Sequence, residues 1–394
     1  MRTQRVCLTL PSFATIAAAL SLTIDSLGAQ GRPSLNVRVP NWSIAGKPRL
    51  LIGNEDAPET QFTAASVRIL PQGDIAVADL QSNEIRHFRA DGLFVRSLSR
   101  TGAGPGEIEG VFILERNGDT LVAIQGAPGP TLTHLFTVGQ GFLGRRPLRA
   151  AGAPRPTPIG RTSDGNTVAM LGAVRIFRET PPVGSVFRDT QTIALIPDAG
   201  GEARVLGTFP AATLMSYGLP TPPRRVLVGA LSIGPALVIG VSGDRVWIGD
   251  SGTGAISVFD GSGRMVHSVR YPAQRRILAE AALRQAREEA LRNASTERER
   301  ARIASTYDPA VRPRSAPFFS RLVAGPAGEI WIIGFEEDPA KGAVALVVDR
   351  DGRPIARADL PARFALQDVG EKWIAGVSLS ENGTERIAVF DLKR

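Results

Sequence analysis

Residues 67–107 decide the fold, and they read VRILPQGDIAVADLQSNEIRHFRADGLFVRSLSRTGAGPGE. Short apolar runs alternate in this stretch with clusters of Gly, Asp, Pro and Asn, a pattern typical of strands joined by tight turns. The runs predict strands over residues 67–70, 75–78, 85–88 and 93–98. Four consecutive antiparallel strands within about 40 residues form one blade of a β-propeller.

The same pattern recurs along the chain. A turn that combines Gly with Asp or Glu precedes the second strand of each expected blade, and Gly there supplies the positive φ of a tight turn. The turn occurs six times, at Gly73-Asp74, Gly118-Asp119, Asp164-Gly165, Gly243-Asp244, Gly328-Glu329 and Gly370-Glu371. Six copies predict an all-β fold, a six-bladed β-propeller that forms one domain over residues 30–394.

The expected blades span residues 62–104, 108–150, 157–209, 233–272, 318–361 and 364–394. Too few residues follow Asp391 for a fourth strand in the last blade, so residues 48–53 are predicted to supply it and to close the ring. Closure removes the exposed sheet edges that invite aggregation. The turn glycines are 45, 47, 78, 85 and 42 residues apart, and the two long intervals predict insertions, including a helical one at residues 273–317 between blades four and five.

The N-terminus has the composition of an export signal. Arg2 and Arg5 precede an apolar run with small residues, and Leu27-Gly28-Ala29 before Gln30 suits a cleavage site. We therefore predict a signal peptide over residues 1–29 and a mature chain without a membrane span, located in a periplasm or outside the cell. The alternative is an uncleaved membrane anchor, which the short apolar run and Pro11 disfavour.

Composition limits the kinds of partner and site. Cys7 is the only cysteine and lies in the predicted signal peptide, so a disulfide framework and a thiolate site are both excluded from the mature chain. The net charge of +8 could suit nucleic acid, but the arginines are scattered and form no dense basic run. We predict no nucleic-acid partner, and we expect a monomer.

Two copies of the repeat carry a family resemblance. The first copy contains Gly73–Asp79 in the form GDIAVAD, followed by Asn83, Ile85, Phe88, Asp91-Gly92 and the Gly-rich residues 102–107; the second spans residues 243–263, with Asp250, Ile256, Val258 and Phe259. These copies resemble NHL-type repeats, and the chain resembles the exported bacterial six-bladed propellers related to NHL-repeat proteins. That family includes RNA- and protein-binding members, an amidating lyase and lactonase-like enzymes, so the resemblance implies a fold rather than one activity.

The long connections are expected to share one face of the propeller. Loops between blades and loops between second and third strands lie on the same side, and they include residues 102–107, 147–158, 172–190, 210–232 and 273–317. Long loops in compact domains are commonly functional, so we predict that this face binds a ligand or partner. The helical residues 273–317 are either a lid on the channel mouth or a docking helix for a partner.

The sequence offers no set of catalytic or metal-binding residues. His87, His134 and His267 fall on third or fourth strands of different blades, away from the axis, so a three-histidine zinc site is not expected. The first strands carry mainly arginines with few carboxylates, which does not suit Ca²⁺. We predict no catalytic residue, no metal and no cofactor, and a binding scaffold rather than an enzyme. The alternative is a metal-assisted hydrolase or lyase with its site in the central channel.

The candidate ligand-binding residues are mostly arginines. Guanidinium groups bind carboxylates and phosphates through paired hydrogen bonds, which would suit a protein or a small anionic ligand. The alternative is that these are solvated side chains of an arginine-rich chain. The candidates are Glu107, Arg161, Arg224, Arg225, Arg321 and Asp368.

Overall fold

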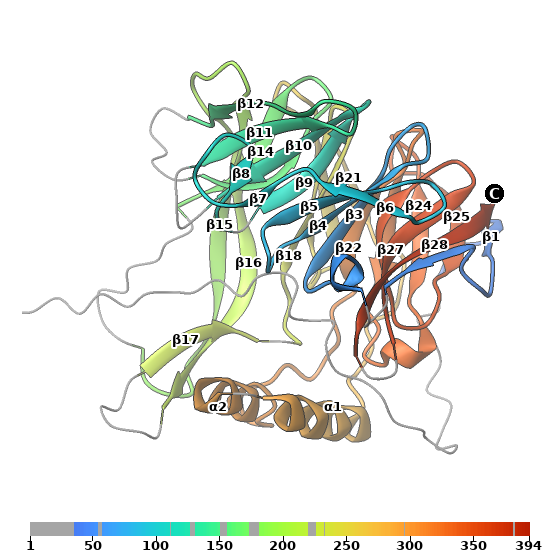
Figure 1. Cartoon of the computed structure of the whole chain (residues 1–394). Helices are drawn as coiled ribbons and strands as arrows, with labels where there is room; N and C mark the ends of the chain where they lie inside the picture. Colours follow the sequence, from blue (N-terminus) through green and yellow to red (C-terminus); the bar gives the residue numbers. More distant parts are fainter. Residues whose placement is uncertain are drawn as a thin grey trace, which may run out of the picture.

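A computed structural model shows a mostly β architecture (Figure 1). It describes residues 35–53, 57–110, 112–126, 131–149, 156–172, 181–219, 226–231, 233–294, 296–380 and 383–394. The predicted signal peptide lies outside these residues. None of the helices found among them is long and apolar enough to cross a membrane.

Within the described residues, the strands form six antiparallel sets that follow chain order. The first strands are β3 (Ala65–Ile69), β9 (Phe112–Asn117), β13 (Thr157–Arg161), β18 (Leu237–Ser242), β22 (Phe319–Ala324) and β26 (Phe364–Val369). The second strands are β4 (Ile75–Asp79), β10 (Thr120–Gln125), β14 (Asn166–Leu171), β19 (Arg245–Asp250), β23 (Ile330–Gly334) and β27 (Trp373–Leu379).

The outer strands complete each set. The third strands are β5 (Glu84–Phe88), β11 (Leu132–Thr137), β15 (Val186–Pro197), β20 (Ala255–Phe259), β24 (Val344–Val348) and β28 (Glu385–Lys393). The fourth strands are β6 (Phe94–Ser97), β12 (Gly141–Pro147), β16 (Arg204–Gly218), β21 (Met265–Arg270) and β25 (Pro354–Asp359). Strands β4, β23 and β24 are buried along their whole length, because neighbouring sets pack face to face.

The first strands form a closed ring. Each contacts the next in the order β3, β9, β13, β18, β22 and β26, and β26 contacts β3 again. Antiparallel four-stranded sheets arranged around a central channel are the plan of a β-propeller. The channel lies where the inner edges of the sheets meet.

Two N-terminal strands join the last sets. Strand β2 (Leu50–Ile52) pairs with β28, with Leu50 opposite Val389, and so occupies the place expected for residues 48–53. Strand β1 (Asn41–Ile44), which the sequence did not suggest, lies parallel to β25 and antiparallel to β28, and it links two sets into one nine-stranded sheet. Trp42 of β1 lies 5.7 Å from the Trp331 ring, and the Arg394 guanidinium lies 4.6 Å over Trp42.

The third set is longer than expected. Residues 210–232 were predicted to be a connection, but β16 continues to Gly218 and pairs with β17 (Val226–Ala230). The sequence did not predict this strand because proline has no amide hydrogen to donate to a neighbouring strand, and Pro210 interrupts the run. In the structure Pro210 lies opposite Thr190, next to a register shift. Strands β15 and β16 project from the body toward the helices (Figure 1).

Two helices lie between β21 and β22. They are α1 (Glu280–Asn293) and α2 (Glu297–Thr306), within the expected insertion at residues 273–317. Helix α2 begins after Thr296, whose hydroxyl accepts a hydrogen bond from the Glu299 amide at 3.1 Å. Apolar residues from the helical segment and from β16 and β17 pack together: Met215, Tyr217, Leu227, Leu231, Ala301 and Val311.

Side chains of the last set satisfy the free inner edge of β3. Three alternate amides of this strand have no neighbouring strand on the channel side, and a buried unpaired amide is costly. The amides of Ala65, Val67 and Ile69 donate to Glu385 Oε2 at 2.8 Å, Gln367 Oε1 at 2.7 Å and Asp368 Oδ2 at 2.8 Å, respectively. We call these three bonds the seam, because they join the first and last sets.

Replacing Trp42 by Ala should weaken the junction made by β1. The change removes the contacts with Trp331 and Arg394, and we expect a loss of about 3 kcal/mol in the free energy of unfolding. Urea denaturation followed by tryptophan fluorescence measures it. The matched control is Ser43→Ala on the exposed side of the same strand, which should stay within about 0.5 kcal/mol of the parent. Equal effects of the two changes would contradict this role of Trp42.

Replacing Glu385 by Gln should change how stability depends on pH. Burial raises the pKa of the Glu385 carboxyl, which the bond from the Ala65 amide only partly opposes. The folded protein therefore favours the protonated carboxyl, and stability falls as pH rises through the raised pKa. Gln keeps an acceptor for the amide without the buried charge. We expect the variant to melt higher than the parent at neutral pH, and the difference to vanish below about pH 4.

The measurement is a series of thermal melts of both proteins across that pH range. Only the difference between the two curves reports on Glu385, because other carboxyls titrate in both. A lower melting temperature for the variant at neutral pH would show that the ionised carboxylate stabilises the seam.

Candidate functional site

The first strands enclose a cavity of about 540 Å³ along the channel. Residues from all six first strands contribute to its wall. Charged side chains dominate the polar part of this wall, with four guanidinium groups facing two carboxylates: Arg68, Arg116, Arg161, Arg321, Glu115 and Asp368. The cavity therefore carries an excess of positive charge.

Asp368 is the most enclosed carboxylate of the wall, at 7% exposure. Its Oδ2 accepts the seam bond from Ile69, and its Oδ1 accepts from the Val369 amide at 3.1 Å. Arg116 Nη2 lies 3.6 Å from Oδ1. Burial raises the pKa of the Asp368 carboxyl, although the charges of Arg68 and Arg116 oppose the change.

Both Nη groups of Arg68 are engaged in the wall. Its Nη1 donates to the Val67 carbonyl at 2.9 Å and to the Gln367 carbonyl at 3.3 Å, and its Nη2 donates to Glu115 Oε2 at 3.3 Å. Burial alone would lower the pKa of this guanidinium, but Glu115 and Asp368 outweigh it and the pKa is raised. Arg68 thus fixes the Glu115 carboxylate by a hydrogen bond and contributes positive electrostatic potential to the cavity.

Arg321 differs from its neighbours because no carboxylate pairs with it among the described residues. Its Nη1 donates to the Leu366 carbonyl at 2.8 Å. Burial lowers the pKa of the guanidinium, and the charge of Arg68 lowers it further. A buried cation without a counter-ion is costly, and an anion in the cavity would relieve that cost.

Arg161 lies in the cavity wall but is already paired. Its Nε donates to Asp198 Oδ2 at 3.0 Å, and its Nη2 also bonds that oxygen. Arg146 donates to the same carboxylate oxygen at 2.7 Å. Arg161 can contribute positive electrostatic potential to the cavity, but two of its hydrogen-bond donors are already bound to Asp198.

The structure places the other sequence candidates elsewhere. Glu107 is not among the wall residues; it belongs to β8 (Glu107–Ile108), which lies parallel to β7 (Arg100–Thr101). Its carboxylate accepts from the Gly104 amide at 2.7 Å and from Arg100 Nε at 2.8 Å, and these two bonds lower its pKa. Glu107 therefore organises the Gly-rich loop. Arg224 and Arg225 lie outside the described residues.

Glycine is required in that loop by the position of Glu107. A Cβ at Gly102 would lie 2.2 Å from Glu107 Oε2, and one at Gly104 would lie 2.8 Å from it. The loop is a turn between the first and second sets that is built around a carboxylate.

The cavity also reaches a different face from the one expected. Its wall includes Gly118, Ser163, Gly243 and Pro326, which lie at the turns between first and second strands. These turns are on the face opposite the long connections. On the loop-rich side, Arg188 is neutralised by Asp250, whose two oxygens lie 2.5 and 3.1 Å from its Nη atoms.

Sequence reasoning missed Arg116 and Gln367. Consecutive residues of a strand point to opposite sides. If Glu115 faces the channel, this rule places Arg116 away from it, so Arg116 was not selected. A first strand meets the channel with its edge rather than with a face, and side chains from both faces can therefore reach the cavity. The sequence feature that could have indicated Arg116 is the charged pair Glu115-Arg116, just before the turn at Gly118.

The three histidines are far from forming a cluster. His87 Nε2 lies 2.8 Å from Asp74 Oδ2, and the His267 ring packs against Trp247. His134 is completely buried and bonds Gln125 Oε1 at 3.2 Å; burial, with the charge of Arg145, lowers its pKa to about 4. In the part of the chain that the structure describes, no group of three or more His, Cys, Asp or Glu side chains could hold a metal ion.

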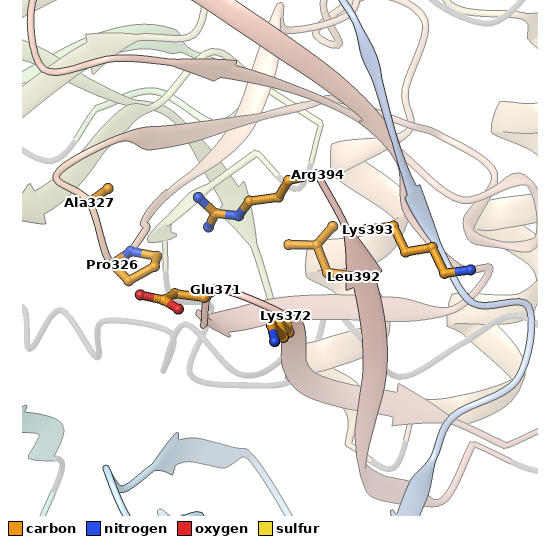
Figure 2. A pocket seen from close by; sticks show the side chains of 7 residues that line it. All are labelled: Pro326, Ala327, Glu371, Lys372, Leu392, Lys393 and Arg394. Atoms are coloured by element: carbon orange, nitrogen blue, oxygen red, sulfur yellow. The ribbon is translucent and has the colours of Figure 1, made fainter.

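A second cavity, of about 730 Å³, lies beside the last strand (Figure 2). Arg394 points into it, whereas Lys393 points away. The Arg394 guanidinium is already held by Glu329 Oε1 at 2.7 Å and by the Gly370 carbonyl at 3.2 Å. This cavity is larger than the channel cavity, but it lacks a buried charge without a partner, so the channel is the better candidate site.

Comparisons with known proteins agree with the fold. No protein-family model and no curated protein matches the chain. A DUF4221-family protein from Bacteroides vulgatus is similar in structure, with 10% identity, a TM-score of 0.52, and coverage of 91% of this chain and 100% of that chain.

Two further structures cover most of the chain at lower TM-scores. A proposed exported protein from Bacteroides fragilis has 11% identity, a TM-score of 0.43, and coverage of 92% of this chain and 99% of that chain. Virginiamycin B lyase from Staphylococcus aureus has 13% identity, a TM-score of 0.37, and coverage of 88% and 98%. At such low identity the likeness concerns the fold alone, and it rests on the Bacteroides vulgatus protein.

Proposed function

We propose that this chain is an exported, six-bladed β-propeller that acts as a binding scaffold and takes a small anionic ligand in its channel. The observation that carries the ligand class is Arg321, a half-buried guanidinium in the cavity wall without a carboxylate partner among the described residues. Arg116 is the second group available to the ligand, since its contact with Asp368 is long. Arg68 and Arg161 add positive field.

The number of blades is supported by the ring of first strands. Each of the six antiparallel sets provides one inner strand, and the cycle from β3 to β26 closes on itself. Strand β2 acts as the fourth strand of the last blade, where it pairs with β28. The export signal is supported by the sequence of residues 1–29, and the helical insertion by the position of α1 and α2 between the fourth and fifth sets.

The cavity suits a small molecule better than a macromolecule. Its volume falls in the range typical of metabolite sites, roughly 300–1,000 Å³. An anion in this enclosed space would receive charge-assisted hydrogen bonds, which are stronger than neutral ones. Among the described residues, only Nη1 of Arg321 has a hydrogen-bond acceptor, the Leu366 carbonyl. The edge of a guanidinium formed by Nε and Nη2 suits a paired contact with two oxygens of an anion.

Sulfate binding to the mature protein tests this proposal, because sulfate is a compact dianion. Isothermal titration calorimetry at constant ionic strength should show binding, and Arg321→Gln should weaken it by at least about tenfold, since a charged hydrogen-bond donor is lost. The matched control is Arg353→Gln, which removes an arginine whose side chain is 77% exposed on a turn. The control should bind like the parent.

Folding of the Arg321 variant is checked by its melting temperature. The change removes a half-buried charge that has no carboxylate partner among the described residues, so we expect the melting temperature without sulfate to stay level or to rise. Equal sulfate affinity of the parent and the Arg321 variant would overturn the channel site. Equal losses in the Arg321 and Arg353 variants would show that sulfate binds the general positive surface instead.

A further inference from the structure

A carboxylate of the protein, that of Asp368, lies beside the arginines that would bind an anionic ligand in the channel. Asp368 Oδ1 lies 3.6 Å from Arg116 Nη2, and Asp368 also lies in the field of Arg68. With Asp368 ionised, this carboxylate partly neutralises the guanidinium groups that would receive an anion. An incoming anion therefore competes with a group of the protein itself.

We propose that Asp368 is an internal counter-ion that the ligand displaces from Arg116, so that the channel binds a small dianion together with one proton. This inference rests on the proposed function, and it specifies the charge of the ligand and the pH regulation of the site. The proton comes from solvent and adds to the Asp368 carboxylate, which becomes a neutral carboxyl. No other covalent bond forms or breaks within the protein, and the ionic contact between Arg116 and Asp368 is exchanged for one between Arg116 and the ligand.

The contact between Arg116 and Asp368 is built to be exchanged. At 3.6 Å it is longer than a normal hydrogen bond, so little is lost when it is broken. The Arg116 side chain is 29% exposed and can turn toward the cavity, whereas the Asp368 side chain is 9% exposed and is fixed by two backbone amides. The arginine is therefore the mobile partner.

Charge balance favours a dianion over a monoanion. Arg161 of the cavity wall is paired with Asp198 and is left out of the count. The other charged groups that share the wall with Asp368 come from three strands: Arg68 on β3, Glu115 and Arg116 on β9, and Arg321 on β22. Glu115 is bound by Arg68. Once Asp368 is neutral, three guanidinium groups face only Glu115, which leaves two positive charges for the ligand.

Asp368 is the group placed to accept the proton. A dianion beside an ionised Asp368 would bring like charges together in a poorly hydrated space, and this arrangement favours protonation of a carboxylate. Glu115 is more exposed than Asp368, at 28% against 9% for the side chain, and has Arg68 as a hydrogen-bonded partner. Burial already raises the pKa of Asp368, in the same direction.

The test compares two probes whose own charge does not change near neutral pH: sulfate, a dianion, and methanesulfonate, a monoanion. Titration calorimetry between about pH 5 and pH 8 should show sulfate affinity rising by up to about tenfold for each unit that pH falls, the limit for one linked proton. Sulfate should bind more tightly than methanesulfonate at acidic pH. Repeating the titration in buffers of different ionisation enthalpy should give an uptake of about one proton per sulfate.

Asp368→Asn should remove this behaviour. The variant keeps an oxygen for the Ile69 amide but loses the acceptor of the Val369 amide together with the titrating group. We expect it to bind sulfate with an affinity that is nearly independent of pH and at least as high as that of the parent near neutral pH. The matched control is Asp351→Asn, which removes a carboxylate that is 70% exposed on the turn between β24 and β25 and should retain the pH dependence.

The outcomes separate this inference from the proposed function. If the parent binds sulfate and Arg321→Gln weakens that binding, but the parent affinity does not depend on pH and no proton is taken up, the channel site stands and the role of Asp368 is wrong. If the pH dependence survives in the Asp368 variant, another group takes the proton and the inference also fails. If the parent does not bind sulfate at any pH, both proposals fail together. The parent experiments do not depend on whether the variant folds.

Discussion

Closure of the ring is the constraint on which the rest of the structure depends. The inner strand of an isolated four-stranded sheet leaves one row of backbone groups unpaired, and in a buried channel these groups need partners. At the junction of the first and last sets, the partners are the side chains of Gln367, Asp368 and Glu385, which accept from alternate amides of β3. Strand β2 pairs with β28 on the outer side of the last set, and β1 joins the last set to the fifth set through β25.

The same closure concentrates charge in the channel. Because first strands meet the axis with their edges, side chains from both faces of a strand reach the cavity, and Arg116 joins Glu115 there. Asp368 takes part both in the closure of the ring and in the charge of the channel. One of its oxygens accepts the seam bond from Ile69, and the other lies near Arg116. The residue that helps to hold the ring together thus also sets the electrostatic balance of the proposed binding site.

Repetition made the strands predictable, whereas the site depends on contacts between distant segments. The turns at Gly73, Gly118 and Gly243 indicated second strands because local turn chemistry is visible in sequence. Arg161, Arg321 and Asp368 were chosen as polar residues of first strands, and all three line the cavity. Glu107 was chosen because it lies just before the first strand of the second blade, and it instead orders its own loop, because the Gly104 amide and Arg100 bind its carboxylate. Which arginines lack a counter-ion, and which face of the ring the cavity reaches, depend on side chains brought together across blades.

Selenate provides the most direct measurement of the central claim, that the channel binds an anion between Arg321 and Arg116. Selenate resembles sulfate in shape and charge, and selenium scatters X-rays anomalously. A crystal structure of the mature protein grown at acidic pH with selenate should show an anomalous peak in the channel, within hydrogen-bond distance of the Arg321 guanidinium, with Arg116 turned away from Asp368. Anomalous peaks only at exposed arginines such as Arg353, with none in the channel, would show that the channel does not bind the anion.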